Sequence, residues 1–237
     1  MKLIFATGNA GKLREAREIL APHGIEVVSP FDIGLTPEQV EVEETGSTFA
    51  ENAELKVRHL FELTGQPCFA DDSGLEVDAL GGAPGIYTAR YAAMDGFGED
   101  HNFTSNINKL LHNLQGVSDR RARFVCAVAL ALPAGSQPKD LSAGKGPLLR
   151  VASQPCTGKC SARGIPAGNV SGIQLFKGTC EGRIAHEPAG CGGFGYDPVF
   201  IADAFPDRTL AEVEEGAKNA ISHRGYALAA MLDYLKS

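Results

Sequence analysis

The first 28 residues combine patterns that restrict the fold. Residues 2–6 form a short apolar run typical of a buried strand, and residues 11–21 place apolar side chains on one face at helical spacing. A second strand-like segment, Ile25–Val28, follows directly. Strand, helix and strand in this order are typical of a βαβ unit. We therefore expect an α/β protein.

Later segments continue this alternation. Residues 48–63 carry apolar side chains at helical spacing, with Ser47 or Thr48 as the N-cap and Glu51 placed as in a capping box. The segment 67–91 predicts a short buried strand, a tight acidic turn, a second strand and a loop rich in glycine and proline. Further helices are expected at residues 100–114 and 222–236, and further strands of a twisted central sheet at 121–132, 173–176 and 180–185.

Length and composition suit one soluble domain spanning residues 1–237. The chain is 43% hydrophobic and 22% charged, with a net charge of −7. A negative chain has little general affinity for nucleic acid or anionic membranes, although a local basic pocket for a phosphorylated small molecule is compatible with it. No stretch approaches the roughly 20 apolar residues of a membrane span, and the N-terminus is unlike a signal peptide. We therefore expect a cytoplasmic protein that binds neither nucleic acid nor membrane.

The stretch from about residue 134 to residue 170 interrupts the pattern. It is rich in glycine, proline, serine and alanine with little periodicity, which predicts an exposed insertion within the domain. It holds Cys156 and Cys160, the only close pair among six cysteines. A zinc site needs two further ligands, and no nearby cysteine or histidine has a familiar ligand spacing. Free loop cysteines are therefore favoured over a zinc site.

The turn Thr7–Asn9 joins the first strand to the first helix, and Lys12 follows in the first helical turn. A glycine here lets the backbone approach a ligand closely, and the helix N-terminus and the lysine both favour an anion. The turn therefore predicts a phosphate cradle. It is not a P-loop, because Ala6 and Leu13 stand where that motif needs glycine and serine or threonine. The alternative is a plain loop with Asn9 as the helix N-cap.

Two adjacent carboxylates, Asp71 and Asp72, follow an apolar run and precede Ser73-Gly74. Packing does not explain such a pair, whose repulsion a bound Mg²⁺ would relieve. A second acidic run, Glu41–Glu44, precedes the helix at 48–63. The alternatives are an Asx-type turn for the aspartates and a solvated loop for the glutamates.

Residues 190–200 place four glycines around Phe194 and Tyr196, and Asp197 follows. Glycines beside an aromatic ring suit a flat ligand stacked on that ring, and the carboxylate could accept hydrogen bonds from ring N–H groups of a base. The alternative is a hairpin with aromatic packing.

Ser222 is a good N-cap for the final helix, and His223 and Arg224 follow it. Cations are unfavourable in a first helical turn, which suggests that they are used. Both could donate to a carbonyl oxygen, and Lys218 could join the same pocket. The alternative is a solvent-facing pair.

Taken together, six ordered motifs resemble the non-standard purine nucleoside triphosphate pyrophosphatases, also called inosine triphosphate pyrophosphatases or the Ham1-like family. The resemblance covers nearly the whole chain. The motifs are T-G-N-x-G-K at residues 7–12, T-F-x-E-N-A at 48–53, A-D-D-S-G-L at 70–75, G-A-P-G-I-Y-T-A-R-Y at 82–91, G-G-F-G-Y-D-P-x-F at 192–200 and S-H-R-G at 222–225.

The resemblance implies an enzyme that hydrolyses ITP, dITP and XTP to the monophosphate and pyrophosphate with Mg²⁺, which removes deaminated purines from the nucleotide pool. It also implies an elongated, two-lobed fold with a long twisted mixed sheet flanked by helices, an active site in the cleft between the lobes, and a homodimer. The insertion at about 134–170 looks longer than the family's usual loop and touches none of the motifs.

The resemblance also implies roles for single residues. Asp72 matches a metal ligand that accepts a proton from the attacking water, and Glu43 matches a second metal-linked carboxylate, with Glu41 and Glu44 as neighbouring alternatives. The implied substrate contacts are the triphosphate with Thr7, Gly8, Asn9, Ala10, Gly11 and Lys12, the substrate with Ser73, and the base with Phe194, Gly195, Tyr196, Asp197, Lys218, His223 and Arg224.

Donors directed at the 6-keto oxygen of hypoxanthine or xanthine would meet the amino group of adenine donor to donor, so buried groups would stay unpaired. Two other functions were weighed. A Maf-like pyrophosphatase acting on pyrimidine or modified nucleotides is disfavoured by the S-H-R-G and F-G-Y-D motifs. A non-enzymatic nucleotide sensor is disfavoured by the Asp71-Asp72 pair, since a pure binder needs no water-activating carboxylate.

Overall fold

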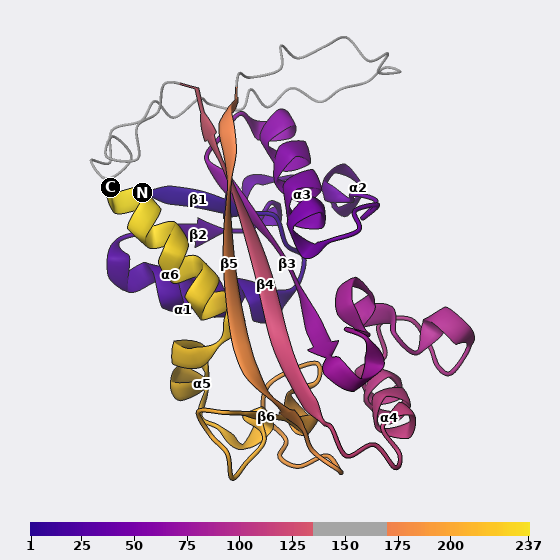
Figure 1. The fold of residues 1–237 in the computed structure, drawn as a ribbon. Coiled ribbons are helices and arrows are strands. Elements are labelled where there is room, and N and C mark those ends of the chain that lie inside the picture. The colour runs from indigo at the N-terminus through magenta and orange to yellow at the C-terminus, as the bar shows by residue number, and fades with distance from the viewer. Residues whose placement is uncertain (135–169) are drawn as a thin grey trace.

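The computed structural model describes residues 1–134 and 170–237. In these ranges six strands form one mixed sheet in the order β2-β1-β3-β4-β5-β6 (Figure 1). β1 runs parallel to β2 and β3, and the remaining neighbours are antiparallel. The strands are β1 (Lys2–Phe5), β2 (Glu26–Val28), β3 (Cys68–Val77), β4 (Arg121–Pro133), β5 (Val170–Ile184) and β6 (Phe200–Ala202). The expected α/β fold with a mixed sheet is confirmed.

The expected helices are also confirmed, with small differences at their ends. The α-helices in the described parts of the chain are α1 (Ala10–Leu20), the short α2 (Pro37–Val40), α3 (Phe49–Thr64), α4 (Phe103–Asn113), α5 (Glu215–Ile221) and α6 (His223–Lys236). Thr48 is the N-cap of α3, where its hydroxyl forms a capping box with Glu51, and Gly65 caps the other end in the left-handed region. Ser222 caps α6 by accepting a hydrogen bond from the Gly225 N–H.

Helices cover both faces of the sheet at one end of the molecule. α1 and α6 lie on one face and α3 lies on the other (Figure 1). Even-numbered residues 126–132 of β4 join the core under α1 and α6, whereas odd-numbered residues 125–131 join the core under α3. This alternation follows from the two-residue period of a strand, and burial on both faces explains why β4 is apolar throughout.

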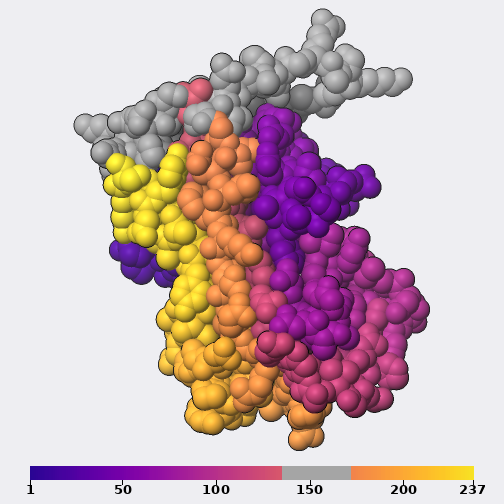
Figure 2. All heavy atoms as spheres, in the orientation of Figure 1, coloured from indigo at the N-terminus to yellow at the C-terminus, as the bar shows by residue number. Residues whose placement is uncertain are grey.

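The long strands β3, β4 and β5 continue beyond these helices toward a second lobe (Figure 1). There a separate core forms around Leu75, Leu110 of α4, and Tyr196 and Phe200 near β6. Figure 2 shows β5 as a band along the molecular surface between α6 and α3. The two lobes therefore share one sheet, which sets the positions of residues from distant parts of the sequence.

The structure contradicts the prediction of two strands and an acidic turn within residues 67–91. β3 is one continuous strand, and Asp71 and Asp72 pair in its middle with Val128 and Ala127 of β4. The Asx-type turn weighed for the two aspartates is therefore also wrong. Neighbouring residues of a strand point to opposite faces, so the two carboxylates do not face each other.

The prediction of separate strands at 173–176 and 180–185 is wrong as well, because β5 is one strand. The sequence interpretation placed a break near Gly178. This glycine instead lets α6 approach the strand, since a Cβ atom there would lie 2.0 Å from the carbonyl oxygen of His223.

Most of the predicted insertion at 134–170, with Cys156 and Cys160, lies outside the described residues. Cys68, Cys126, Cys180 and Cys191 are free thiols. Among the helices of the described ranges, none combines the length and apolar character needed to cross a membrane.

The close approach of α6 to β5 predicts that Gly178→Ala destabilises the protein. The added methyl group would also lie 2.5 Å from the Ala227 nitrogen, so the helix must shift, at a cost of about 3 kcal/mol. Gly216→Ala in α5 is the matched control, because nothing lies within 4 Å of its added Cβ and alanine favours a helix by up to about 1 kcal/mol. Urea unfolding measures both free energies, and equal stability of the two variants would contradict this account of Gly178.

Candidate active site

A cavity of about 570 Å³ lies where both lobes and both sheet faces contribute residues. Its size falls in the range of about 300–1,000 Å³ that is common for small-molecule sites. The predicted site residues that line it are Thr7, Gly8, Asn9, Lys12, Asp72, Ser73, Phe194, Gly195, Tyr196, Asp197, Lys218 and His223. Those that do not line it are Ala10, Gly11, Glu43 and Arg224.

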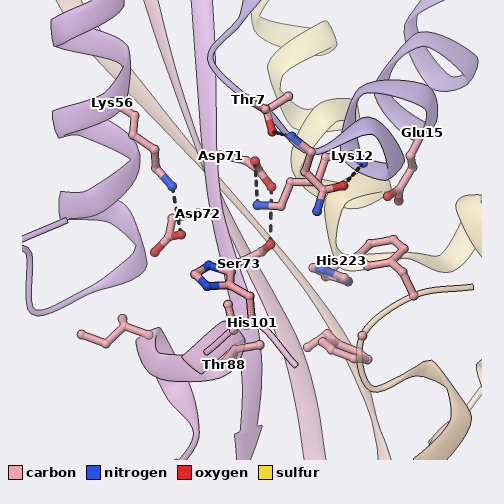
Figure 3. Close-up of a pocket in the computed structure, with 18 of the residues that line it drawn as sticks. Thr7, Lys12, Glu15, Lys56, Asp71, Asp72, Ser73, Thr88, His101 and His223 are labelled. Atoms are coloured by element: carbon pink, nitrogen blue, oxygen red, sulfur yellow. Dashed lines mark hydrogen bonds and ion pairs between the residues drawn. The ribbon is translucent and has the colours of Figure 1, made fainter. Parts of the chain in front are cut away.

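The turn after β1 forms one wall of this cavity (Figure 3). The Asn9 side chain accepts hydrogen bonds from the N–H groups of Gly11 and Lys12, at 2.9 and 3.1 Å. Asn9 is therefore an N-cap, as the plain-loop alternative proposed. The Lys12 ammonium also lines the cavity and donates to Asp71 at 3.0 Å. A helix N-terminus and an adjacent lysine together make this wall attractive to an anion.

Behind this wall lies a buried ion-pair network centred on Asp71. Arg224 at the start of α6 is almost fully buried and donates to Asp71 at 3.0 Å and to Glu15 of α1. Glu15 also accepts a hydrogen bond from the Ser222 hydroxyl at 2.6 Å. Burial raises the pKa of the Asp71 carboxyl, but Lys12 and Arg224 lower it more, so this pKa lies well below its ordinary value.

This network explains why a cation is found in the first turn of α6. The solvent-facing alternative is wrong for Arg224, because two carboxylates surround its guanidinium. Burial lowers the pKa of Arg224, while Asp71 and Glu15 raise it more, so the side chain stays charged. Its remaining nitrogen donates to the Ser73 hydroxyl at 3.2 Å. Arg224 therefore supports the cavity wall from behind.

Asp72 lies on the opposite face of β3, next to α3 (Figure 3). It accepts hydrogen bonds from Lys56 at 3.1 Å and from Asn52 at 3.3 Å. Burial raises the pKa of the Asp72 carboxyl above its ordinary value, although Lys56 and Lys12 oppose this. The same lysine donates to Glu44 at 3.1 Å. Two carboxylates and one ammonium thus gather on this side of the cavity.

The aromatic end of the cavity is organised by Asp197. One oxygen of its carboxylate accepts hydrogen bonds from the Phe194 N–H at 2.7 Å and from the Lys218 ammonium at 2.5 Å. Gly193 makes this possible, because a Cβ atom there would lie 2.1 Å from that oxygen. Lys218 also lies 4.8 Å from the centre of the Phe194 ring. A ring and a cation are thereby held side by side.

Tyr196 and His223 complete this end. Tyr196 is buried, and its hydroxyl donates to the backbone carbonyl of Thr88 across the cavity at 3.0 Å. The His223 ring stacks on Phe124 with 4.9 Å between the ring centres. Burial holds the pKa of His223 well below its ordinary value, with Arg224 acting in the same direction. The ring is therefore neutral at pH 7 and offers one donor and one acceptor.

Sequence analysis missed several cavity residues: Lys56, Thr88, Arg90 and His101. A signal for Lys56 was present. Asn52 and Lys56 are one helical turn apart and border the apolar stripe of α3, so both were bound to face the sheet at Asp72. Thr88 and Arg90 lie in the motif at residues 82–91, which was recognised without assigning them a role, and they belong to the 3-10 helix Gly85–Arg90. His101 lies in a turn and carries no such signal.

The donor set fits a hard divalent cation. Of the cavity carboxylates, Glu15 and Asp71 are committed to Arg224, and Asp197 is committed to Lys218. Asp72 and Glu44 remain, which share Lys56 as a partner, whereas Glu43 does not line the cavity. No group of three or more histidine, cysteine, aspartate or glutamate side chains in the described ranges could hold a metal. Two carboxylates suit Mg²⁺, which takes its other ligands from water and phosphate.

Fold and cavity together define a class of protein: an α/β protein whose two-lobed mixed sheet carries a cleft for an anionic ligand with a flat group. The comparison with family models agrees with this class. The Ham1 family model matches residues 3–147 and 148–234. The chain belongs to the Ham1 family.

Individual relatives cover the chain almost completely. A dITP/XTP pyrophosphatase of Bacillus licheniformis is 43% identical over 98% of this chain and 98% of its own length. That of Escherichia coli K12 is 41% identical over 100% of this chain and 98% of its own length. Among solved structures, the Staphylococcus aureus Ham1 protein matches with a TM-score of 0.73 and 33% identity, covering 100% of this chain and 98% of that one.

The lowered pKa of His223 predicts a pH-dependent stability. In the unfolded chain a histidine binds a proton near pH 6.5, whereas folded His223 resists it, so stability is complete above that pH and falls below it. Between pH 7 and pH 5 the wild type should therefore lose more stability than His223→Gln, by at most about 2 kcal/mol, the limit for one histidine with an ordinary unfolded pKa. Urea unfolding at both pH values measures this, with His23→Gln, an exposed histidine, as the control that keeps the wild-type slope. Parallel wild-type and His223→Gln curves would contradict it.

Proposed function

We propose that this protein hydrolyses the non-standard purine nucleoside triphosphates ITP, dITP and XTP to the nucleoside monophosphate and pyrophosphate. The observation that carries the proposal is the composition of one cavity. Lys12 in the first turn of α1 and Lys56 of α3, which pairs with Asp72, both line the cavity, and Phe194 lines it together with Lys218, whose ammonium lies over the Phe194 ring. The names of the relatives support the same substrates.

The polyphosphate would lie against the turn after β1. Gly8 leaves the backbone accessible there, and Lys12 and Lys56 supply two ammonium groups within the cavity. Both lysines are paired with aspartates, so phosphate oxygens would compete with carboxylates for them. Charge-assisted hydrogen bonds to several phosphate oxygens favour that exchange.

Asp72 is the proposed general base. It would accept a proton from water as the water oxygen attacks the α-phosphorus, and pyrophosphate would leave as the α–β anhydride bond breaks. Its raised pKa brings the carboxylate closer to the range in which a general base works well at neutral pH. Asn52 and Lys56 orient its two oxygens.

Mg²⁺ is the proposed cofactor, held by Asp72 and Glu44, and when bound it would neutralise phosphate charge. We propose Glu44 in place of Glu43 because Glu44 lines the cavity and shares Lys56 with Asp72. The other glutamates of the acidic run do not line the cavity.

The base would stack on Phe194 and meet His223 and Lys218 at its edge. Both side chains can donate to a 6-keto oxygen, and adenine would present its amino group to the same donors. Arg224 would act on the base indirectly, because its contacts with Asp71 and Glu15 fix the start of α6 beside His223. On the family resemblance, we further propose a single-domain, cytoplasmic homodimer.

The proposal predicts a substrate and product pattern. With Mg²⁺, the protein should release pyrophosphate from ITP and XTP about a hundredfold faster than from ATP, as kcat/KM, because adenine leaves buried donors unpaired. The measurement assays pyrophosphate and orthophosphate separately for ITP, XTP, GTP, ATP, dTTP and UTP. Orthophosphate as the first product would move the cleavage to the γ-phosphate. Preference for dTTP or UTP would favour a Maf-like activity, and no product would favour a nucleotide sensor.

A second prediction concerns the base. Asp72→Asn removes the proton acceptor and should lower kcat on ITP by about 10²–10⁴-fold while the protein stays folded by circular dichroism. Glu54→Gln is the matched control, since it neutralises an exposed carboxylate on α3 that pairs only with Arg58. Wild-type turnover by Asp72→Asn would rule out Asp72 as the base.

A further inference from the structure

Lys56 pairs with both carboxylates that are proposed to hold the metal. Its ammonium lies 3.1 Å from Asp72 and 3.1 Å from Glu44, and Figure 3 shows the side chain extending from α3 to Asp72. Only 15% of the Lys56 side chain is exposed. The lysine therefore pairs with the same two carboxylates that would hold a divalent cation.

An ammonium and Mg²⁺ cannot share this position. Mg²⁺ binds oxygen ligands at about 2.1 Å, whereas the ammonium holds the same oxygens at 3.1 Å. A divalent cation held by Asp72 and Glu44 would place a double positive charge next to the ammonium, which is strongly unfavourable at such short range. Lys56 has to leave before the metal enters.

Among the described residues, the carboxylates that act on Lys56 are Asp72, Glu44 and Asp71. Arg90 adds a further positive charge 3.6 Å from Glu44, and Asp71 is occupied by Lys12 and Arg224. Asp72 and Glu44 carry two negative charges, which Lys56 already neutralises in part. A metal ion alone would leave this corner with excess positive charge, and phosphate groups would remove that excess.

We infer that Lys56 is a resident counterion of the metal position: it blocks free metal and releases Asp72 and Glu44 when phosphate groups of an incoming nucleotide take up its ammonium. This inference rests on the proposed metal site and goes beyond it, because it makes metal and polyphosphate binding mutually dependent. Asn52 would keep Asp72 oriented during the exchange, since it holds the second carboxylate oxygen independently of Lys56. Lys56 is thus a positioning residue for the metal ligands as well as a phosphate contact.

The test measures metal binding without turnover. Mn²⁺ serves as the probe, its affinity is measured by electron paramagnetic resonance, and inorganic pyrophosphate stands in for the polyphosphate. In the absence of pyrophosphate, Lys56→Met should bind Mn²⁺ at least about tenfold more tightly than the wild type, because a competing charge within about 4 Å is gone. Pyrophosphate should tighten Mn²⁺ binding strongly in the wild type and much less in Lys56→Met, and the reverse coupling should change equally.

Two further variants keep the result interpretable. Lys177→Met removes an exposed lysine of β5 that does not line the cavity, so it should leave Mn²⁺ affinity unchanged. Lys56→Gln removes the charge but keeps a polar group, and it replaces Lys56→Met if the latter does not fold by circular dichroism. If Lys56 had only a structural role, its removal would not raise the affinity for Mn²⁺.

Each remaining outcome overturns the inference in a recognisable way. Equal or weaker Mn²⁺ binding by the Lys56 variants, with ITP hydrolysis intact in the wild type, removes the counterion role and leaves the proposed function standing. Failure of every protein to bind Mn²⁺, with or without pyrophosphate, removes the metal site and the inference together.

Discussion

The buried contact between Asp71 and Arg224 is the interaction on which the site depends most. It joins the middle of β3 to the first turn of α6, and Lys12 ties the turn after β1 to the same carboxylate. Removing one partner of such a buried pair costs about 3–5 kcal/mol, because the other charge stays buried without compensation. Three segments that line the cavity are therefore positioned by one carboxylate. Ser73 also receives its hydrogen bond from this network.

Because side chains alternate between the two faces of a strand, the adjacent aspartates of β3 lie in different environments. Asp71 faces α1 and α6, where Lys12 and Arg224 lower its pKa and keep it ionised, while Asp72 faces α3, where burial raises its pKa. Opposite environments for neighbouring acids are a common way to separate a structural from a catalytic role. A turn, as expected from the sequence, would have mixed the two carboxylates, whereas a continuous strand isolates them.

Local sequence patterns predicted the helices and their caps, whereas contacts between distant residues could not be predicted from the sequence. Asn9, Thr48 and Ser222 were recognisable as N-caps because capping involves residues only two or three positions apart. The pairing of Asp71 with Arg224 joins residues 153 positions apart, so no local pattern signals it. The sequence therefore predicted that the first-turn cations of α6 matter but assigned both of them to one task. The continuity of β3 and β5 could not be predicted for a related reason. Aspartate and glycine usually interrupt strands, but here Asp71 is paired with Lys12 and Arg224, and Gly178 packs against α6.

The start of α6 shows how the two ends of the cavity are coupled. His223 lines the cavity, and the next residue, Arg224, is bound to the same carboxylate as Lys12. Under the proposed function, a polyphosphate would draw Lys12 away from Asp71, and Arg224 would then be the cation in direct contact with this carboxylate. The attraction between Asp71 and Arg224 would become stronger, because Lys12 would no longer compete for the same oxygen atoms. The position of His223 at the start of α6 would thus be coupled to phosphate binding through Asp71.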